Sequence, residues 1–268
     1  MPAYAPAFCG LLPHPPIIVP EVGRDRLIDC RATEQACRDF AERCVASRPD
    51  RLFMVSPHSP RRGEAFGLWR GRLQGDLGRF GAAGSGVDLP DDPTAAEALR
   101  EAATEHGLDT WQIEGEPLDH GAVVPLWFLA QAGWDGPTTL ASLPWHPTPA
   151  RMQAFGNAIA HTYAALEGRA ALIASGDMSH RVKPDAPAGY HPRAVEFDHQ
   201  LTDLVAQGKL GAIADIPLEL RELAAEDAAD SSLIVASAIG LRPRGEDVLS
   251  YEHPFGVGYL VAVFHDGT

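Results

Sequence analysis

The sequence has no excess of basic residues and no long apolar run. Its 22 Lys and Arg residues are outnumbered by 36 Asp and Glu residues, which gives a formal net charge of −14. Because contacts to phosphates need clustered Lys or Arg, this balance argues against nucleic acid as the main partner. No stretch approaches the roughly 18 consecutive apolar residues of a transmembrane helix. The N-terminus also lacks the basic start and apolar run of a signal peptide, so we expect a cytoplasmic protein without membrane contact.

Cysteine is scarce, because the 268 residues include only four. Cys30, Cys37 and Cys44 recur every seven residues on one face of a predicted helix. Residues two helical turns apart are too distant for disulfides with each other, and the spacing lacks the C-x-x-C pairs of a zinc site. We therefore expect these residues, and Cys9 in an apolar run, to be free thiols packed in the core.

Three common catalytic signatures are also absent. The sequence has no glycine-rich phosphate loop after its first strand, no G-x-S-x-G nucleophile elbow and no H-E-x-x-H metal motif. These absences argue against nucleotide binding and serine hydrolysis. A content of 45% hydrophobic and 22% charged residues is nevertheless that of an ordinary folded domain.

Short apolar runs alternate with segments of helical periodicity along the whole chain. We expect strands at 8–12, 51–56, 138–143, 170–175 and 257–264, and helices at 24–47, 93–106, 122–132, 149–167, 192–207 and 218–239. Residues 59–92 are rich in Gly and Arg and are expected to form irregular loops with one hairpin. No linker or repeat divides the chain. This alternation predicts one α/β domain, residues 1–268, with a largely parallel central sheet flanked by helices.

Three of the apolar strands run into loops that carry a histidine, namely His14, His58 and His180. Open α/β sheets bind ligands outside the carboxyl ends of their strands, so these loops are expected to converge on one site. Prolines beside His14 and His58 restrict the backbone and suit metal ligands. Two histidines and one carboxylate would leave positions open on Fe(II) for a substrate and O₂.

Five short segments that carry histidine, proline or glycine occur one after another along the chain. They are Gly10-Leu-Leu-Pro-His-Pro-Pro16, Ser56-Pro-His-Ser-Pro60, Asp119-His-Gly-Ala-Val-Val-Pro-Leu126, Ser175-Gly-Asp-Met-Ser-His180 and Tyr251-Glu-His-Pro-Phe-Gly-Val-Gly-Tyr259. Together they resemble the motifs of the class III extradiol dioxygenase catalytic-subunit superfamily, which includes the Memo-like proteins. The resemblance extends from residue 10 to about residue 264 and implies the α/β fold of that superfamily.

The resemblance also implies roles for the matching histidines. His14 and His58 take the positions of the two iron-binding histidines. His180 takes that of the histidine thought to act as base and acid during ring cleavage, and His120 that of a histidine that contacts the substrate. We predict that Asp177, three residues before His180, orients it; a turn or capping role is the alternative for this carboxylate.

The third iron ligand is a carboxylate in the dioxygenases and a cysteine in Memo-like proteins. Here the corresponding segment reads Ala225-Glu-Asp-Ala-Ala-Asp-Ser231, where relatives often carry Glu-Cys-Gly-x-Arg-Ser. Glu226 and Asp227 are both candidate metal ligands, with a slight preference for Glu226. Asp230 replaces the arginine of the relatives and changes the expected substrate pocket.

These residues predict a non-heme Fe(II) dioxygenase that opens a catechol or aminophenol ring with O₂. A histidine with a pKa near 6.5 can accept the phenolic proton and later return it, which suits His180. One alternative is a Memo-like protein that binds metal for redox or protein-interaction work without ring cleavage. Another is a zinc-dependent hydrolase. By analogy we expect a homodimer, and some enzymes of this type also need a small second subunit.

Overall fold

The structure is a computed structural model that describes residues 4–267. An eight-stranded sheet with the strand order β6-β3-β7-β2-β8-β1-β10-β9 forms its centre. The strands are β1 (Phe8–Leu12), β2 (Arg51–Ser56), β3 (Phe66–Trp69), β6 (Thr110–Ile113), β7 (Thr138–Ser142), β8 (Ala170–Ser175), β9 (Asp247–Glu252) and β10 (Tyr259–Asp266). The central strands β7, β2, β8 and β1 run parallel, whereas β10 and β9 continue the sheet antiparallel on one side. The predicted α/β fold with a mostly parallel sheet is therefore confirmed.

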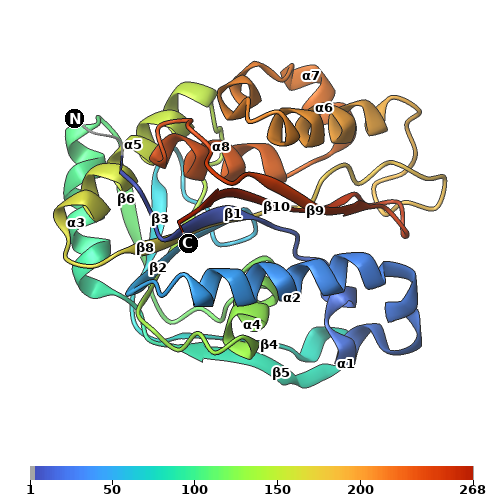
Figure 1. Cartoon of the computed structure of the whole chain (residues 1–268), viewed down its shortest axis with the longest axis horizontal. Helices are drawn as coiled ribbons and strands as arrows, with labels where there is room; N and C mark the ends of the chain where they lie inside the picture. The colour runs from blue at the N-terminus through green and yellow to red at the C-terminus, as the bar shows by residue number, and fades with distance from the viewer. Residues whose placement is uncertain (1–3, 268) are drawn as a thin grey trace.

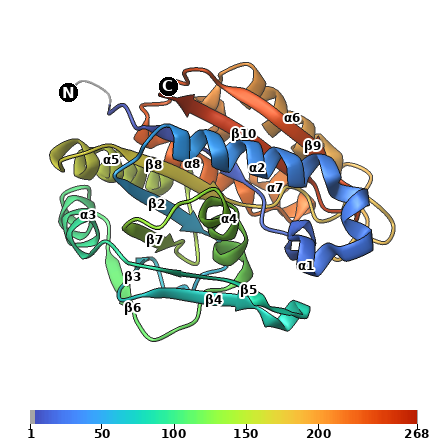
Figure 2. The ribbon, with the colours of Figure 1, turned by 60° about the horizontal axis from the view of Figure 1, so that its bottom comes forward.

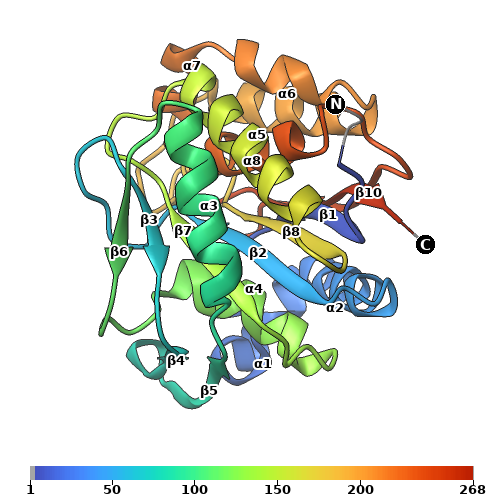
Figure 3. The same ribbon diagram turned by 90° about the vertical axis from the view of Figure 1, so that its left-hand side faces the viewer.

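Helices cover both faces of this sheet (Figures 1 and 2). The longer helices are α2 (Arg31–Ala46), α3 (Pro93–Glu105), α4 (His120–Gln131), α5 (Pro149–Ala165), α6 (Ala194–Ala206), α7 (Leu218–Ala224) and α8 (Ala228–Ala238). Shorter turns are η1 (Pro16–Ile18), α1 (Pro20–Gly23), η2 (Arg24–Cys30), η3 (Gly78–Phe80) and η4 (Leu210–Asp215). Helices α2 and α4 lie on one face, and Figure 3 shows α3, α5 and α8 across the other.

Strand β2 illustrates why the sequences of the central strands are continuous apolar runs. Phe53 and Val55 point into the core beneath α3 and α5, whereas Leu52 and Met54 point into the core beneath α2 and α4. Successive side chains alternate between the faces of a sheet, so a strand covered on both sides must be apolar at every position. The parallel strands thus present their carboxyl ends along one edge, where the histidine-bearing loops begin.

The structure corrects several sequence-based boundaries. Strands β3, β6 and β9 were not anticipated, although the predicted hairpin within 59–92 is confirmed as β4 (Leu73–Leu77) and β5 (Ala82–Leu89). The helix predicted at 24–47 begins as the 3-10 turn η2. The helix predicted at 218–239 is broken into α7 and α8, because Ala225 adopts a left-handed conformation with φ of 54°. This break contains both candidate acidic ligands.

The cysteines behave as predicted. Cys9, Cys30, Cys37 and Cys44 are all free and buried. Within residues 4–267, no helix combines the length and the apolar character needed to cross a membrane.

Candidate metal centre

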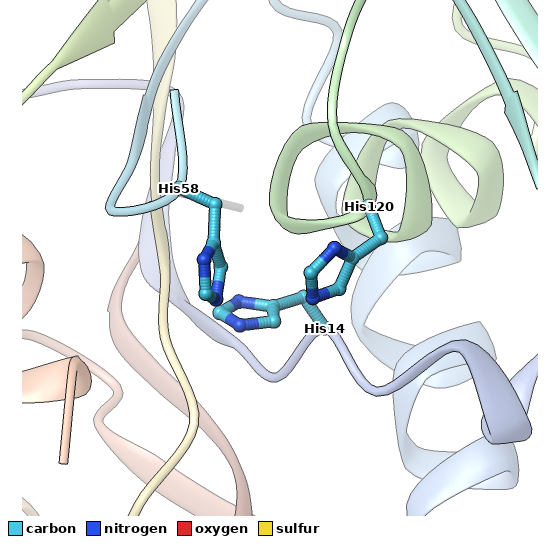
Figure 4. A group of neighbouring side chains, drawn as sticks. All are labelled: His14, His58 and His120. Atoms are coloured by element: carbon cyan, nitrogen blue, oxygen red, sulfur yellow. The ribbon is translucent and has the colours of Figure 1, made fainter. Parts of the chain in front are cut away.

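Three histidines from separate segments meet at the carboxyl edge of the sheet (Figure 4). His14 follows β1, His58 follows β2, and His120 is the first residue of α4. Their potential ligand nitrogens all lie within 4.8 Å of one another. The ring centroids of His58 and His120 are 4.6 Å apart, and that of His14 lies 4.8 Å from His58. The three side chains could hold a metal ion, so His120 joins the two predicted ligands in this cluster.

Hydrogen bonds indicate which nitrogen of His14 is available to a metal. The Ser175 hydroxyl donates to the carbonyl oxygen of Gly121 at 2.6 Å, so at 2.9 Å it accepts from Nδ1–H of His14. The opposite nitrogen, Nε2, then carries a lone pair and has no hydrogen-bond partner among the described residues although it is buried. Burial lowers the pKa of His14 to about 3, so the ring is neutral at pH 7. A hydrogen-bonded Nδ1 and a free Nε2 are typical of a metal-binding histidine.

Asp227 supplies a carboxylate beside two of these rings. Its Oδ2 lies 3.2 Å from Nε2 of His58 and 3.7 Å from Nε2 of His14. Burial opposes ionisation of Asp227, but His14 and His58 outweigh it and lower the carboxyl pKa to about 2. Burial likewise works to lower the pKa of His58, whose side chain is 37% exposed, but Asp227 raises it overall. The donor set of two imidazoles and a carboxylate fits a divalent transition metal.

Glu226, the slightly preferred candidate for the third ligand, is bonded away from the histidines. Its Oε1 accepts from Nε of Arg221 at 2.5 Å, and its Oε2 accepts from the N–H of Ala229 at 2.8 Å. Arg221 also binds Asp230 at 2.7 Å. Both oxygens of Glu226 are therefore occupied in closing the turn between α7 and α8. The adjacent position, Asp227, is left to face the rings.

His180 lies in the loop after β8 and interacts electrostatically with His14, His120 and Asp227. Its N–H donates to the carbonyl of Ala224 at 2.9 Å, and its buried Nδ1 has no hydrogen-bond partner among residues 4–267. The structure thus places the predicted acid/base residue beside the cluster.

Asp177 contacts His14 rather than His180. Its Oδ1 accepts from the N–H of His14 at 2.9 Å, and its Oδ2 lies 3.8 Å from Nε2 of that ring. Burial, with the charge of Asp227, raises the pKa of Asp177 well above its ordinary value. The predicted orientation of His180 by Asp177 is not supported by any hydrogen bond between them in the described part of the chain. Asp177 instead fixes the backbone of a metal-centre histidine.

Asp119 joins two of the histidine-bearing segments, a role that was not anticipated from the sequence. Its Oδ1 accepts from the N–H of Ala122 at 3.2 Å and so caps α4 directly before His120. Its Oδ2 accepts from the Ser59 hydroxyl at 3.2 Å, next to His58. A carboxylate immediately before a helical apolar run is a recognisable capping signal, but its second contact depends on the tertiary fold.

Comparisons with known proteins identify relatives of this chain. The chain is 28% identical over 265 residues to Protein CA_C1420 of Clostridium acetobutylicum. The aligned region covers 94% of this chain but 56% of that protein. The chain therefore spans about half the length of this curated relative. The crystal structure of the uncharacterized protein JW3007 from Escherichia coli K12 has a similar fold, with a TM-score of 0.60 and 18% identity over 85% of this chain and 91% of that one.

The model of one family, described as the catalytic LigB subunit of aromatic ring-opening dioxygenase, matches residues 8–262. That range includes the three clustered histidines, His180 and Asp227. Because the match covers nearly the whole chain, the chain belongs to the family of catalytic LigB subunits of aromatic ring-opening dioxygenases.

Proposed function

We propose that the protein is an Fe(II)-dependent extradiol dioxygenase that opens a catechol- or aminophenol-type ring with O₂. The observation that carries this proposal is the free, buried Nε2 of His14, which faces the Asp227 carboxylate beside His58. Two histidines and a carboxylate are the donors of non-heme iron oxygenases, which leave positions open for substrate and O₂. A carboxylate at position 227 also favours this reading over a Memo-like site, where a cysteine is expected.

His14, His58 and Asp227 are the residues that would hold the iron. When bound, Fe(II) supplies a centre that binds the adjacent ring oxygens and holds O₂ beside the ring. His180 would take the proton from a ring hydroxyl and return it after cleavage, since it lies beside these groups without being bonded to them. Burial lowers the pKa of His120. A neutral imidazole has one N–H donor and one acceptor nitrogen, so His120 can donate a hydrogen bond to the substrate and accept another.

The proposal is tested by loading the full chain with Fe(II) without air and measuring O₂ uptake against a panel of catechols and aminophenols. We expect uptake matched mole for mole by a ring-opened product. His14→Ala should lose both iron and uptake, whereas His199→Ala, at an exposed position on α6, should keep both.

Two other outcomes would each contradict the proposal. Bound iron with no uptake for any ring would favour the Memo-like alternative. Bound zinc with hydrolysis of an ester or amide would favour the hydrolase. The expected homodimer and small second subunit stay predictions, which mass measurement of the active species would test.

A further inference from the structure

An apolar cavity of about 500 Å³ is lined in part by Pro15, the residue that follows His14. Its lining includes Pro15, Phe80, Pro187, Phe255, Tyr259 and Arg26. A volume of this size suits a small organic ligand. No acidic side chain of the described residues is part of the lining.

Several walls of the cavity come from segments that also position the metal-centre residues. Pro15 directly follows His14, and the Phe80 ring, on the turn between β4 and β5, meets the His120 ring edge-on at 5.5 Å. Pro187 precedes Ala188, whose N–H donates to the carbonyl of His180 at 3.3 Å. A ring bound at the histidines would therefore have this cavity beside it.

Phe80 is a large apolar side chain that is 43% exposed. In the flanking strands β4 and β5, by contrast, Leu73, Leu77 and Leu89 are buried. The place of Phe80 against His120 gives the cavity an apolar wall at the side of the metal centre.

Two polar groups interrupt the apolar lining. The guanidinium of Arg26 lies over the Phe255 ring, 4.4 Å from its centroid, and no carboxylate of residues 4–267 forms an ion pair with it. The second is Tyr259, whose side chain is 3% exposed. Arg26 is exposed apart from this stacking contact, and the N–H groups of its planar guanidinium suit a bidentate anion such as a carboxylate.

We propose that this cavity receives the substituent of the ring substrate, and that the substituent is an apolar chain ending in an anionic group bound by Arg26. The reacting ring would lie at the histidines, a step that rests on the proposed function. The chain would pack on Phe80 and Phe255, and the anion would reach the guanidinium. Arg26 and Phe80 are thus specificity-determining residues outside the metal centre.

Binding of compounds that cannot be cleaved tests this inference without relying on turnover. The probes are phenylalkanoates of increasing chain length and their uncharged amides, titrated into the full chain by calorimetry with and without Fe(II). We expect the acid to bind more tightly than its amide. Arg26→Gln should weaken binding of the acid about tenfold or more, because it removes a charged hydrogen-bond donor, and leave the amide unchanged.

Matched variants separate this effect from a general loss of charge. Arg31→Gln removes the same charge at an exposed position outside the cavity and should bind the acid like the wild type. Arg26→Lys keeps the charge without the planar guanidinium, so its affinity for the acid should lie between those of Arg26→Gln and the wild type. Phe80→Ala should weaken binding of the acid and binding of the amide equally, since this substitution removes apolar contact only. Equal binding of acid and amide by the wild type, or equal losses in Arg26→Gln and Arg31→Gln, would overturn the inference.

Turnover then distinguishes failure of this inference from failure of the proposed function. A catechol that carries such a chain should have a lower KM than catechol itself, and Arg26→Gln should raise that KM with little change in kcat. If catechols are opened but the chain does not lower KM, the cavity assignment is wrong while the dioxygenase stands. If acids bind through Arg26 but no ring is opened, the cavity stands as a binding site and the dioxygenase is wrong.

Discussion

The N–H of Asp177 donates to Oδ1 of Asp227 at 2.7 Å, and the N–H of Asp227 donates in return to the carbonyl of Asp177 at 3.1 Å. These residues are 50 positions apart, and their two hydrogen bonds connect the loop after β8 to the start of α8. The reciprocal bonds occupy Oδ1 of Asp227 and leave its Oδ2 facing His58. The position of the candidate third ligand therefore depends on close contact between two distant segments.

That contact requires glycine at position 176. A Cβ on Gly176 would lie 2.4 Å from Cα of Ala228 and 2.9 Å from the carbonyl oxygen of Asp227. We expect Gly176→Ala to lower the free energy of unfolding by about 1–3 kcal/mol and to weaken metal binding, because the two segments must separate. Urea unfolding and metal titration measure the two effects. Gly84→Ala is the control, since nothing lies within 4 Å of its Cβ; equal behaviour of both variants would contradict the argument.

Substitution of the adjacent acids should identify the third ligand. Asp227→Asn is expected to reduce metal affinity by more than the roughly 10–100-fold loss typical of residues that only support a ligand. Glu226→Gln should keep the metal but lower the free energy of unfolding by about 1–3 kcal/mol, because Arg221 loses a charged partner. Metal content after dialysis and unfolding curves check the two outcomes. Loss of metal from Glu226→Gln with retention in Asp227→Asn would reverse the assignment.

Removal of the proposed acid/base should affect turnover and leave metal binding intact. We expect His180→Gln to lower kcat by roughly 10²–10⁴-fold, because proton transfer from the ring hydroxyl loses its acceptor. The iron content should equal that of the wild type, since His14, His58 and Asp227 are unchanged. His199→Gln is the matched control, and wild-type kcat in His180→Gln would exclude the assigned role.

Stability should depend on pH through Asp198, a fully buried residue of α6. Its carboxylate accepts from the N–H of Ser179 at 2.8 Å and from the Tyr251 hydroxyl at 2.7 Å. Burial, opposed by these two bonds, raises the carboxyl pKa to about 7. A group whose pKa is higher folded than unfolded favours folding below the unfolded value of about 3.9 and loses that contribution as pH rises through about 7.

Asp198→Asn removes this titration while keeping an acceptor for Ser179 and a partner for Tyr251. We therefore expect its stability relative to the wild type to increase with pH, by on the order of 1–3 kcal/mol between about pH 4 and about pH 8. Urea unfolding across that range measures the difference. Asp203→Asn, an exposed change on the same helix, should show no such trend. A difference for Asp198→Asn that stays constant with pH would contradict the burial argument.

The sequence by itself determined the central strands and most of the site histidines. Strands β1, β2 and β8 occur where they were predicted, because a strand buried on both faces must be a continuous apolar run. His14, His58 and His180 could be placed at one edge because parallel strands end on the same side of a sheet. Edge strands such as β6 (Thr110–Ile113) and β9 (Asp247–Glu252) were missed, since they are only partly buried and lack that signal.

Only the tertiary structure decided which acid faces the metal centre. Glu226 and Asp227 are neighbours in a segment whose alanines favour an unbroken helix, so no local pattern distinguishes them. The left-handed Ala225 breaks the helix, Arg221 binds Glu226, and the N–H of Asp177 binds Asp227. The last of these partners lies about 50 residues away along the chain. Such long-range hydrogen bonds form only when the segments pack together, so packing assigns the two carboxylates to opposite sides of the turn.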